Sequence, residues 1–351
     1  MRKVAQVYSG HPEKCYSPRV RCGVVLLVLW ASYALAQTGL QTALTLTRSG
    51  HYAEARRALS GIPEPEDVRQ KIAYHRLKAA IASGLKEASA AATEMRAALA
   101  LAPQDTQLLA ATAVAELQAG QFPQAVNAYQ EAIRLAPENE SYRIALAIAL
   151  IEHQAFESAI DMLKASPKSA KLLVLLGLAQ YGHGDNAEAI DTLEKAAALE
   201  PALDSPKRCL AGIVLESAKL PSQKTMDVLC AWDKTVCAAL QLRRAREDGD
   251  AALEARSVAT LEKEDSAVAH CALGRAYEWR NQLTRAARQM ETCVRLAPTP
   301  QRHYMLALIY RKLGDTVPAH QELELRSKML QQISEQATLT LNALASFQGR
   351  H

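Results

Sequence analysis

One nine-residue ending recurs four times along the chain. It reads MRAALALAP at 95–103, YQEAIRLAP at 129–137, LEKAAALEP at 193–201 and METCVRLAP at 290–298. A bulky apolar residue stands first, a small residue fourth, Leu seventh and Pro ninth. The first, fourth and seventh or eighth residues of a helix share one face, so we expect the apolar ones to be buried together. Proline then ends the helix, because the residue before it is pushed out of helical geometry.

The small fourth residue suggests that a neighbouring helix passes too close for a large side chain. It is Ala98, Ala132, Ala196 and Cys293 in the four copies. Upstream residues recur as well, since Gly177 and Gly274 stand at the same distance before their prolines. Pro103 and Pro137 lie 34 residues apart.

A period of 34 residues with Leu-Gly-x-x-Tyr, then Ala, a bulky residue and Pro, resembles the tetratricopeptide repeat family. Residues 273–277 (LGRAY) are the closest match and Leu176-Gly177 the second, although every copy lacks the tryptophan of the family's first helix. The resemblance implies an all-α fold, a right-handed superhelical array of antiparallel helix pairs with one concave groove and a C-terminal capping helix.

The register of the repeat predicts how the chain is organised. Residues 37–203 form N-terminal repeats, with a turn near 50–52 and one short copy at 140–169. Residues 204–266 have room for two copies but fit the pattern poorly. Good copies return at 267–333, and 334–351 are predicted to be a capping helix and tail.

The N-terminus has the features of a targeting segment. Residues 23–36 (GVVLLVLWASYALA) are uncharged and apolar, two arginines precede them, and they end in a small-x-small pattern. We expect residues 1–36 to be a signal peptide cleaved before Gln37, with translation starting at Met1 or Val20. The run is shorter than the roughly 20 residues that span a membrane, although an uncleaved anchor is the alternative. Export points to a bacterial periplasm or envelope.

Charge excludes two classes of partner. The leader holds five of the 41 basic residues and one of the 37 acidic ones, so the remaining chain has 36 of each. No basic field remains to recruit nucleic acid or an anionic membrane. The expected partner is a protein or peptide, with self-association as a further possibility.

Signatures of catalysis and cofactor binding are weak. HExxH, GxSxG and GxxxxGK[ST] are absent, and the GxGxxA spelling at 182–187 falls in a turn between helices rather than after a strand. We therefore expect no catalytic residue, no metal and no cofactor. The alternative is an enzyme, a thiol oxidoreductase or hydrolase, with its site in residues 204–266.

Five cysteines follow the leader, namely Cys209, Cys230, Cys237, Cys271 and Cys293. An odd number leaves at least one free or paired between chains. A disulfide among the first three would explain how residues 204–266 stay folded. We read Cys293 as a buried small apolar residue in place of the usual alanine.

The family resemblance also implies where a partner would bind. Each repeat has two helices, and side chains at fixed positions of the first helix, called slots here, line the groove. The apolar slots are Val114, Leu117, Ile144, Ile148, Ile151, Val174, Leu178 and Tyr181. Toward the C-terminus the slots carry Arg275, Trp279, Arg311 and Lys312. Family members that grip a carboxylate use Lys and Asn at slots that are apolar here, so an apolar partner segment is expected instead. The alternative is that these residues are ordinary core.

These expectations converge on a non-catalytic protein–protein interaction scaffold of the cell envelope. The alternative with the same fold is a structural protein that associates with copies of itself and binds no other partner.

Overall fold

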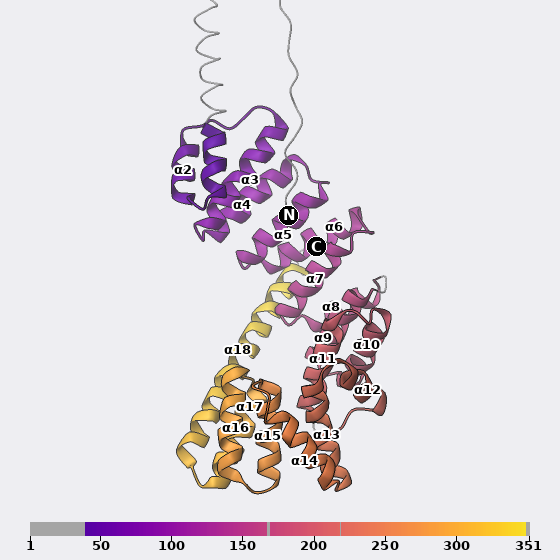
Figure 1. Ribbon diagram of the computed structural model, residues 1–351. Helices are drawn as coiled ribbons and strands as arrows, with labels where there is room; N and C mark the ends of the chain where they lie inside the picture. Colours follow the sequence, from indigo (N-terminus) through magenta and orange to yellow (C-terminus); the bar gives the residue numbers. More distant parts are fainter. Residues whose placement is uncertain (1–38, 167–168, 218, 349–351) are drawn as a thin grey trace, which may run out of the picture. The chain divides into compact units, whose positions relative to one another are not determined.

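The computed structural model describes residues 39–166, 169–217 and 219–348, so the predicted signal peptide lies outside the described residues (Figure 1). All regular secondary structure in these ranges is helical, as the repeat pattern predicted. None of the helices in this part of the chain is long and apolar enough to cross a membrane.

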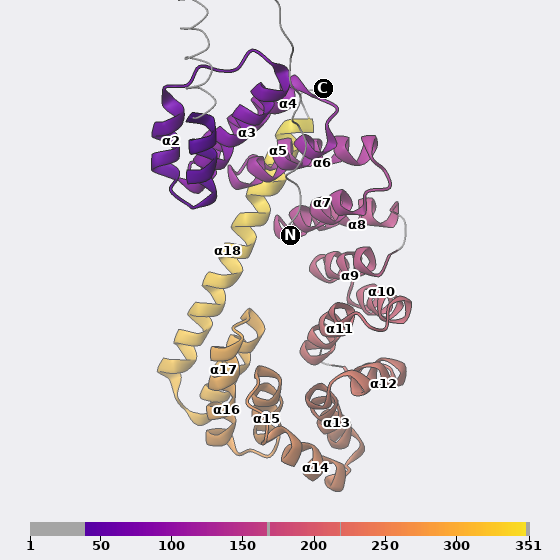
Figure 2. The ribbon, with the colours of Figure 1, turned by 45° about the horizontal axis from the view of Figure 1, so that its top comes forward.

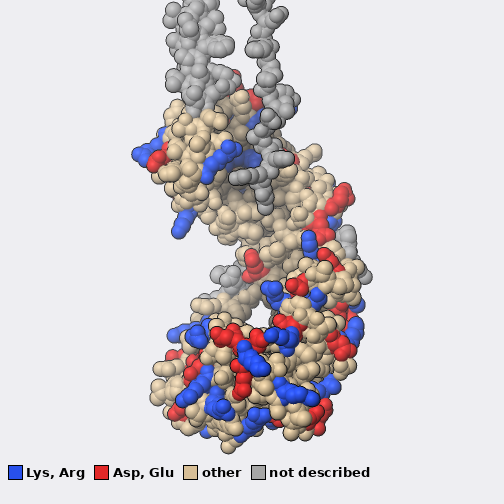
Figure 3. Space-filling model, viewed as in Figure 1, with Lys and Arg blue, Asp and Glu red and all other residues tan. Residues whose placement is uncertain are grey.

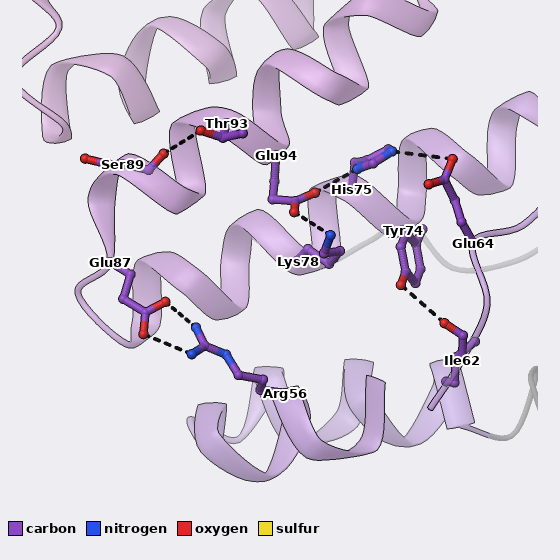
Figure 4. Close-up of polar contacts among 10 residues, drawn as sticks. All are labelled: Arg56, Ile62, Glu64, Tyr74, His75, Lys78, Glu87, Ser89, Thr93 and Glu94. Carbon is purple, nitrogen blue, oxygen red and sulfur yellow. Dashed lines mark hydrogen bonds and ion pairs between the residues drawn. The ribbon is translucent and has the colours of Figure 1, made fainter. Parts of the chain in front are cut away.

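The chain forms two compact units, Met1–Pro103 and Gln104–His351. In the first unit, residues 39–48 are helical and precede α2 (Tyr52–Ser60), α3 (Val68–Gly84) and α4 (Ala88–Leu101). Its apolar core contains Ala55, Leu59 and Ile81. Beside this core, Glu94 of α4 accepts hydrogen bonds from Lys78 and His75 of α3 (Figure 4).

The second unit is a succession of helix pairs (Figures 1 and 2). The pairs are α5 (Thr106–Gln118) with α6 (Phe122–Leu135), α7 (Glu140–Glu152) with α8 (Phe156–Lys164), α9 (Ala170–His183) with α10 (Asn186–Leu199), α11 (Asp204–Glu216) with α12 (Gln223–Trp232), α13 (Lys234–Asp248) with α14 (Ala251–Leu261), α15 (Ala267–Trp279) with α16 (Leu283–Leu296), and α17 (Pro300–Leu313) with α18 (Thr316–Gln348). Residues 204–266 thus hold two helix pairs. Residues 334–348 are not a separate capping helix but continue α18 without a break.

Side-chain caps explain where the first helix begins in most pairs, although α11 has none. The side chain of Asp105 accepts hydrogen bonds from the backbone N–H groups of Gln107 and Leu108, which otherwise have no partner within α5. Asn139, Ser169, Ser266 and Thr299 cap α7, α9, α15 and α17 in the same way.

The small fourth residues of the repeated ending behave as predicted. Ala98, Ala132, Ala196 and Cys293 are completely buried. The leucine at the seventh position is not always buried as predicted, since Leu199 is 56% exposed and Leu296 is 45% exposed. These leucines are the last residues of α10 and α16, so little of the following chain covers them.

Two glycines show why the pattern requires them. A Cβ on Gly177 would lie 2.7 Å from Cγ of Leu193, which leaves no room for a side chain where α9 meets α10. Gly184 has a φ of +105°, the left-handed conformation that glycine adopts at least cost, and ends α9. The GxGxxA spelling therefore lies in a helix–helix turn.

Two disulfides join helices in the C-terminal half. Cys230–Cys237 links α12 to α13, which confirms the expected bond among the first three cysteines, and Cys209 is free. Cys271–Cys293 links α15 to α16 and corrects our reading of Cys293 as a simple replacement for alanine. The buried face of α16 packs directly on α15, which places the two Cα atoms 5.0 Å apart.

Candidate functional site

Three consecutive first helices each expose one large apolar side chain. Val114 of α5 is 46% exposed, Ile148 of α7 is 41% exposed and Tyr181 of α9 is 36% exposed. All three were predicted as groove residues. Single exposed apolar residues are ordinary, but one per helix in successive repeats forms a recurring surface feature. We call these three residues the apolar face.

The other predicted apolar slots lie deeper. Leu117, Ile144 and Ile151 are partly buried against the core built by α5–α9, and Leu178 is partly buried against the next core. They flank the apolar face rather than extend it, because part of each side chain already packs on the protein.

Val174 corrects the prediction. It is only 7% exposed and belongs to a core with Leu210, Ile213 and Val214 of α11. Helix α11 packs on α9 and covers this slot, so Val174 stabilises the array and is not available to a partner.

Tyr181 connects the apolar face to a charged region. Its hydroxyl donates a hydrogen bond to Glu216 of α11 at 3.2 Å. Burial raises the pKa of Tyr181, and the nearby Glu216 carboxylate raises it further, so the phenol remains a neutral donor at physiological pH.

Farther along, the first helices α11, α13, α15 and α17 line a pocket of about 40 Å³. Much of its wall is apolar and comes from Leu215, Leu242, Val268, Trp279 and Met305. Its charged residues are Glu216, Arg243, Arg275 and Arg302. We call it the arginine pocket. In the part of the chain that the structure describes, the C-terminal helices also carry many exposed charges of both signs (Figure 3).

Two of the four predicted C-terminal slots line this pocket. Arg275 donates from Nη1 to the carbonyl oxygen of Leu215 at 2.9 Å. Trp279 is covered on one side by the guanidinium of Arg246, 4.5 Å from the ring centroid. Neither remaining residue lines the pocket, since Arg311 is exposed on α17 and Lys312 pairs with Glu278 at 2.7 Å.

Sequence reasoning missed Glu216, Arg243 and Arg302 as pocket residues. Glu216 and Arg243 lie in residues 204–266, where the repeat register could not be laid. The available signal was Arg243 itself, a charge that directly follows the mostly apolar run at 236–242. Arg302 occupies a slot that the family's groove pattern does not use.

Among the described residues, no group of three or more His, Cys, Asp or Glu side chains could hold a metal ion. Burial raises the pKa of the free thiol at Cys209, an effect that neighbouring Arg208 opposes, so the reactive thiolate is disfavoured.

Sequence models of the tetratricopeptide repeat match residues 116–172 and 155–204. No protein with a curated description matches the chain. Among solved structures, the chain is similar to a tetratricopeptide repeat protein from Parabacteroides merdae, with 15% identity, 81% of this chain and 99% of that one covered, and a TM-score of 0.45. A repeat protein from Cytophaga hutchinsonii has 14% identity over 74% and 96% of the two chains, with a TM-score of 0.45. MamA from Desulfovibrio magneticus has 17% identity over 50% and 95%, with a TM-score of 0.37.

Proposed function

Because the chain belongs to the tetratricopeptide repeat family, we propose that it is a non-catalytic scaffold of the cell envelope that holds an apolar segment of another protein. Proteins built from such repeats generally bind protein partners. The observation that carries the proposal is the apolar face, Val114, Ile148 and Tyr181, which repeats one solvent-exposed apolar side chain on α5, α7 and α9.

The energetics suit a weak interaction. Burying one exposed large apolar side chain contributes at most roughly 1.5–3 kcal/mol. Association itself costs at least about 4 kcal/mol, so the three anchors alone leave at most about 5 kcal/mol, an affinity on the order of 0.1–1 mM. Tighter binding would come from the flanking contacts. A partner helix with apolar residues at helical spacing, or an extended segment with alternating ones, would satisfy this surface.

The envelope setting rests on two independent observations. The N-terminal segment has the features of a signal peptide. The described helices contain two disulfides, and such bonds persist in oxidising compartments such as the periplasm.

Capture from an envelope extract tests the proposal. The bait is the chain from Gln37, compared with a Val114→Glu, Ile148→Glu double variant that charges the apolar face. The matched control is Leu199→Glu, Leu296→Glu, which adds the same charges at exposed apolar positions on second helices.

We expect one partner to be retained by the wild type and the control and lost by the face variant, with all three equally helical by circular dichroism. Equal capture by all three would reject the apolar face as the binding site. Recovery of the chain alone, with concentration-dependent sedimentation, would favour self-association instead.

A further inference from the structure

We propose that the arginine pocket binds an acidic side chain, Asp or Glu, that an extended peptide presents beside an aliphatic residue. The inference rests on the proposed function in one respect, since the pocket lies on first helices that follow those of the apolar face. It adds the chemistry of the ligand, which that function leaves open.

Positive charge in the pocket exceeds the negative charge that faces it. Arg243 donates from Nη1 to Val214 O at 2.8 Å and from Nη2 to Ser217 O at 2.9 Å. These carbonyl groups orient the guanidinium without neutralising it. Glu216 is the one carboxylate in the pocket lining, and it forms an ion pair with Arg302 at 3.6 Å.

The nearby carboxylates are already engaged. Glu216 accepts the hydrogen bond from Tyr181, and Glu278 pairs with Lys312. Three guanidinium groups therefore share one carboxylate within the pocket, and a buried cation without a counterion is costly.

Arg275 has capacity left for a ligand. Its Nε is buried and has no hydrogen-bond partner, while its Nη2 contacts only the weak acceptor Met305 Sδ at 3.3 Å. An unsatisfied buried donor costs free energy that an incoming acceptor would recover. Burial lowers the pKa of Arg275, and neighbouring Arg243 lowers it further against the opposing effect of Glu216, which agrees with an excess of positive charge.

The wall of the pocket selects among anions. A guanidinium matches the planar geometry of a carboxylate, and Leu215, Val268 and Met305 offer apolar contact to a methylene stem. A phosphate dianion carries more charge than a carboxylate and would lose more hydration against this apolar wall. With 36 basic and 36 acidic residues after the leader, the chain also lacks the net positive field that attracts nucleic acid.

Tryptophan fluorescence reports on the pocket directly. The chain has three tryptophans, Trp30 in the leader, Trp232 and Trp279. Trp232→Phe in the chain from Gln37 leaves Trp279 as the sole reporter. The probes are three short peptides with acetylated N-termini and the same flanking residues. The Glu peptide has Leu-Glu-Leu and a C-terminal amide, and the amidated Gln peptide has Leu-Gln-Leu and a C-terminal amide. The free-terminus peptide has Leu-Gln-Leu and a free C-terminal carboxylate.

We expect saturable binding of the Glu peptide below about 1 mM and at least roughly tenfold weaker binding of the amidated Gln peptide. Absence of saturation by the Glu peptide, or equal binding of both amidated peptides, would overturn the proposal. Binding of the free-terminus peptide as tightly as the Glu peptide would assign the site to a chain end and overturn the side-chain assignment.

Variants locate the effect. Arg275→Met should abolish the preference for Glu over Gln, while Arg295→Met, which removes one exposed charge from α16, should preserve it. Arg302→Gln provides a second variant if Arg275→Met fails to fold. Retention of the preference in a folded Arg275→Met or Arg302→Gln protein would exclude the pocket.

The outcome is separable from that of the capture experiment. The Val114→Glu, Ile148→Glu variant should bind the Glu peptide as well as the wild type does. If capture fails but this preference remains, the apolar face is wrong and the pocket stands. If capture succeeds and the preference is absent, the pocket is wrong.

Discussion

Helices α5–α10 and helices α11–α18 belong to the same unit but are held together by different means. The first group relies on small residues that admit large neighbours, such as Gly177 against Leu193. The second group contains both disulfides, and Arg243 reaches from α13 to carbonyl groups at the end of α11. In α11–α14, where few residues match the repeat, the Cys230–Cys237 disulfide and the arginine–carbonyl bonds support the packing. The other disulfide lies between α15 and α16, which match the repeat well.

This difference has a consequence for recognition. In the first group, α5, α7 and α9 expose the apolar side chains of Val114, Ile148 and Tyr181. Packing by arginine leaves guanidinium groups on the first helices that follow. One architecture thus presents two surface chemistries, an apolar face and a charged pocket.

The largest expected effect is a difference in the free energy of unfolding between a core residue and a residue of the apolar face on the same helix, α7. Leu146→Ala removes a side chain that is almost completely buried and should lower the free energy of unfolding by about 3 kcal/mol. Ile148→Ala, two residues later on α7, should change it by less than about 0.5 kcal/mol. Urea unfolding followed by circular dichroism measures both. Similar losses would mean that Ile148 is core and that the apolar face does not exist.

Loss of a disulfide should affect one group of helices. Replacing Cys271 and Cys293 by Ala opens a closed segment with a sequence separation of 22, which should cost about 3 kcal/mol. Hydrogen exchange should increase in α15 and α16 and stay unchanged in α5–α8, because repeat arrays transmit stability mainly between neighbours. A uniform increase over the whole unit would show that the two groups unfold together.

Two glycine substitutions, one in each group, should change stability with opposite signs. Gly177→Ala should destabilise by about 1 kcal/mol, because the new Cβ would press on buried Leu193 and this outweighs the gain in helix propensity. Gly212→Ala on α11 meets nothing within 4 Å, and should stabilise by about 0.5–1 kcal/mol. Thermal unfolding of the two variants tests this contrast. If both variants are more stable than the wild type, α9 and α10 do not pack closely enough at Gly177 to exclude a methyl group.

The sequence predicted what depends on spacing within one repeat. The fourth small residue, the turn at Gly184 and the helix ends before proline all follow from local geometry. Val174 could not be placed correctly, because it is buried by α11, a helix in which few residues match the repeat pattern. The disulfide Cys271–Cys293 required the distance between two helices, which sequence separation alone does not provide.

The fourth position of the first helix shows the same limit. Every copy lacks the family's tryptophan, and three copies have histidine there instead. His75, His270 and His303 each hydrogen-bond a residue 19 positions later, namely Glu94, Gln289 and Glu322. The substitution was visible in the sequence, but its recurring partner on the second helix was not recognised without the fold.

The smallest predicted effect tests one of these polar pairs against the apolar packing of α5–α10. Burial raises the pKa of Glu94, but hydrogen bonds from Lys78 and His75 together outweigh it and hold the pKa below the ordinary 4.5 (Figure 4). A lowered pKa in the folded state stabilises above the unfolded value, and this contribution disappears as the pH falls through the folded value.

Glu94→Gln should therefore cost about 0.5 kcal/mol near neutral pH, and the difference from the wild type should shrink as the pH falls below about 4.5. Hydrogen exchange of α3 and α4 measured across this range gives the profile for the first unit alone. Glu157→Gln, an exposed change on α8, is the control and should leave the profile unchanged. If Glu94→Gln costs the same free energy at every pH, the effect comes from packing and not from the charge of Glu94. The polar pair would then stabilise the first unit in the same way as apolar packing stabilises α5–α10.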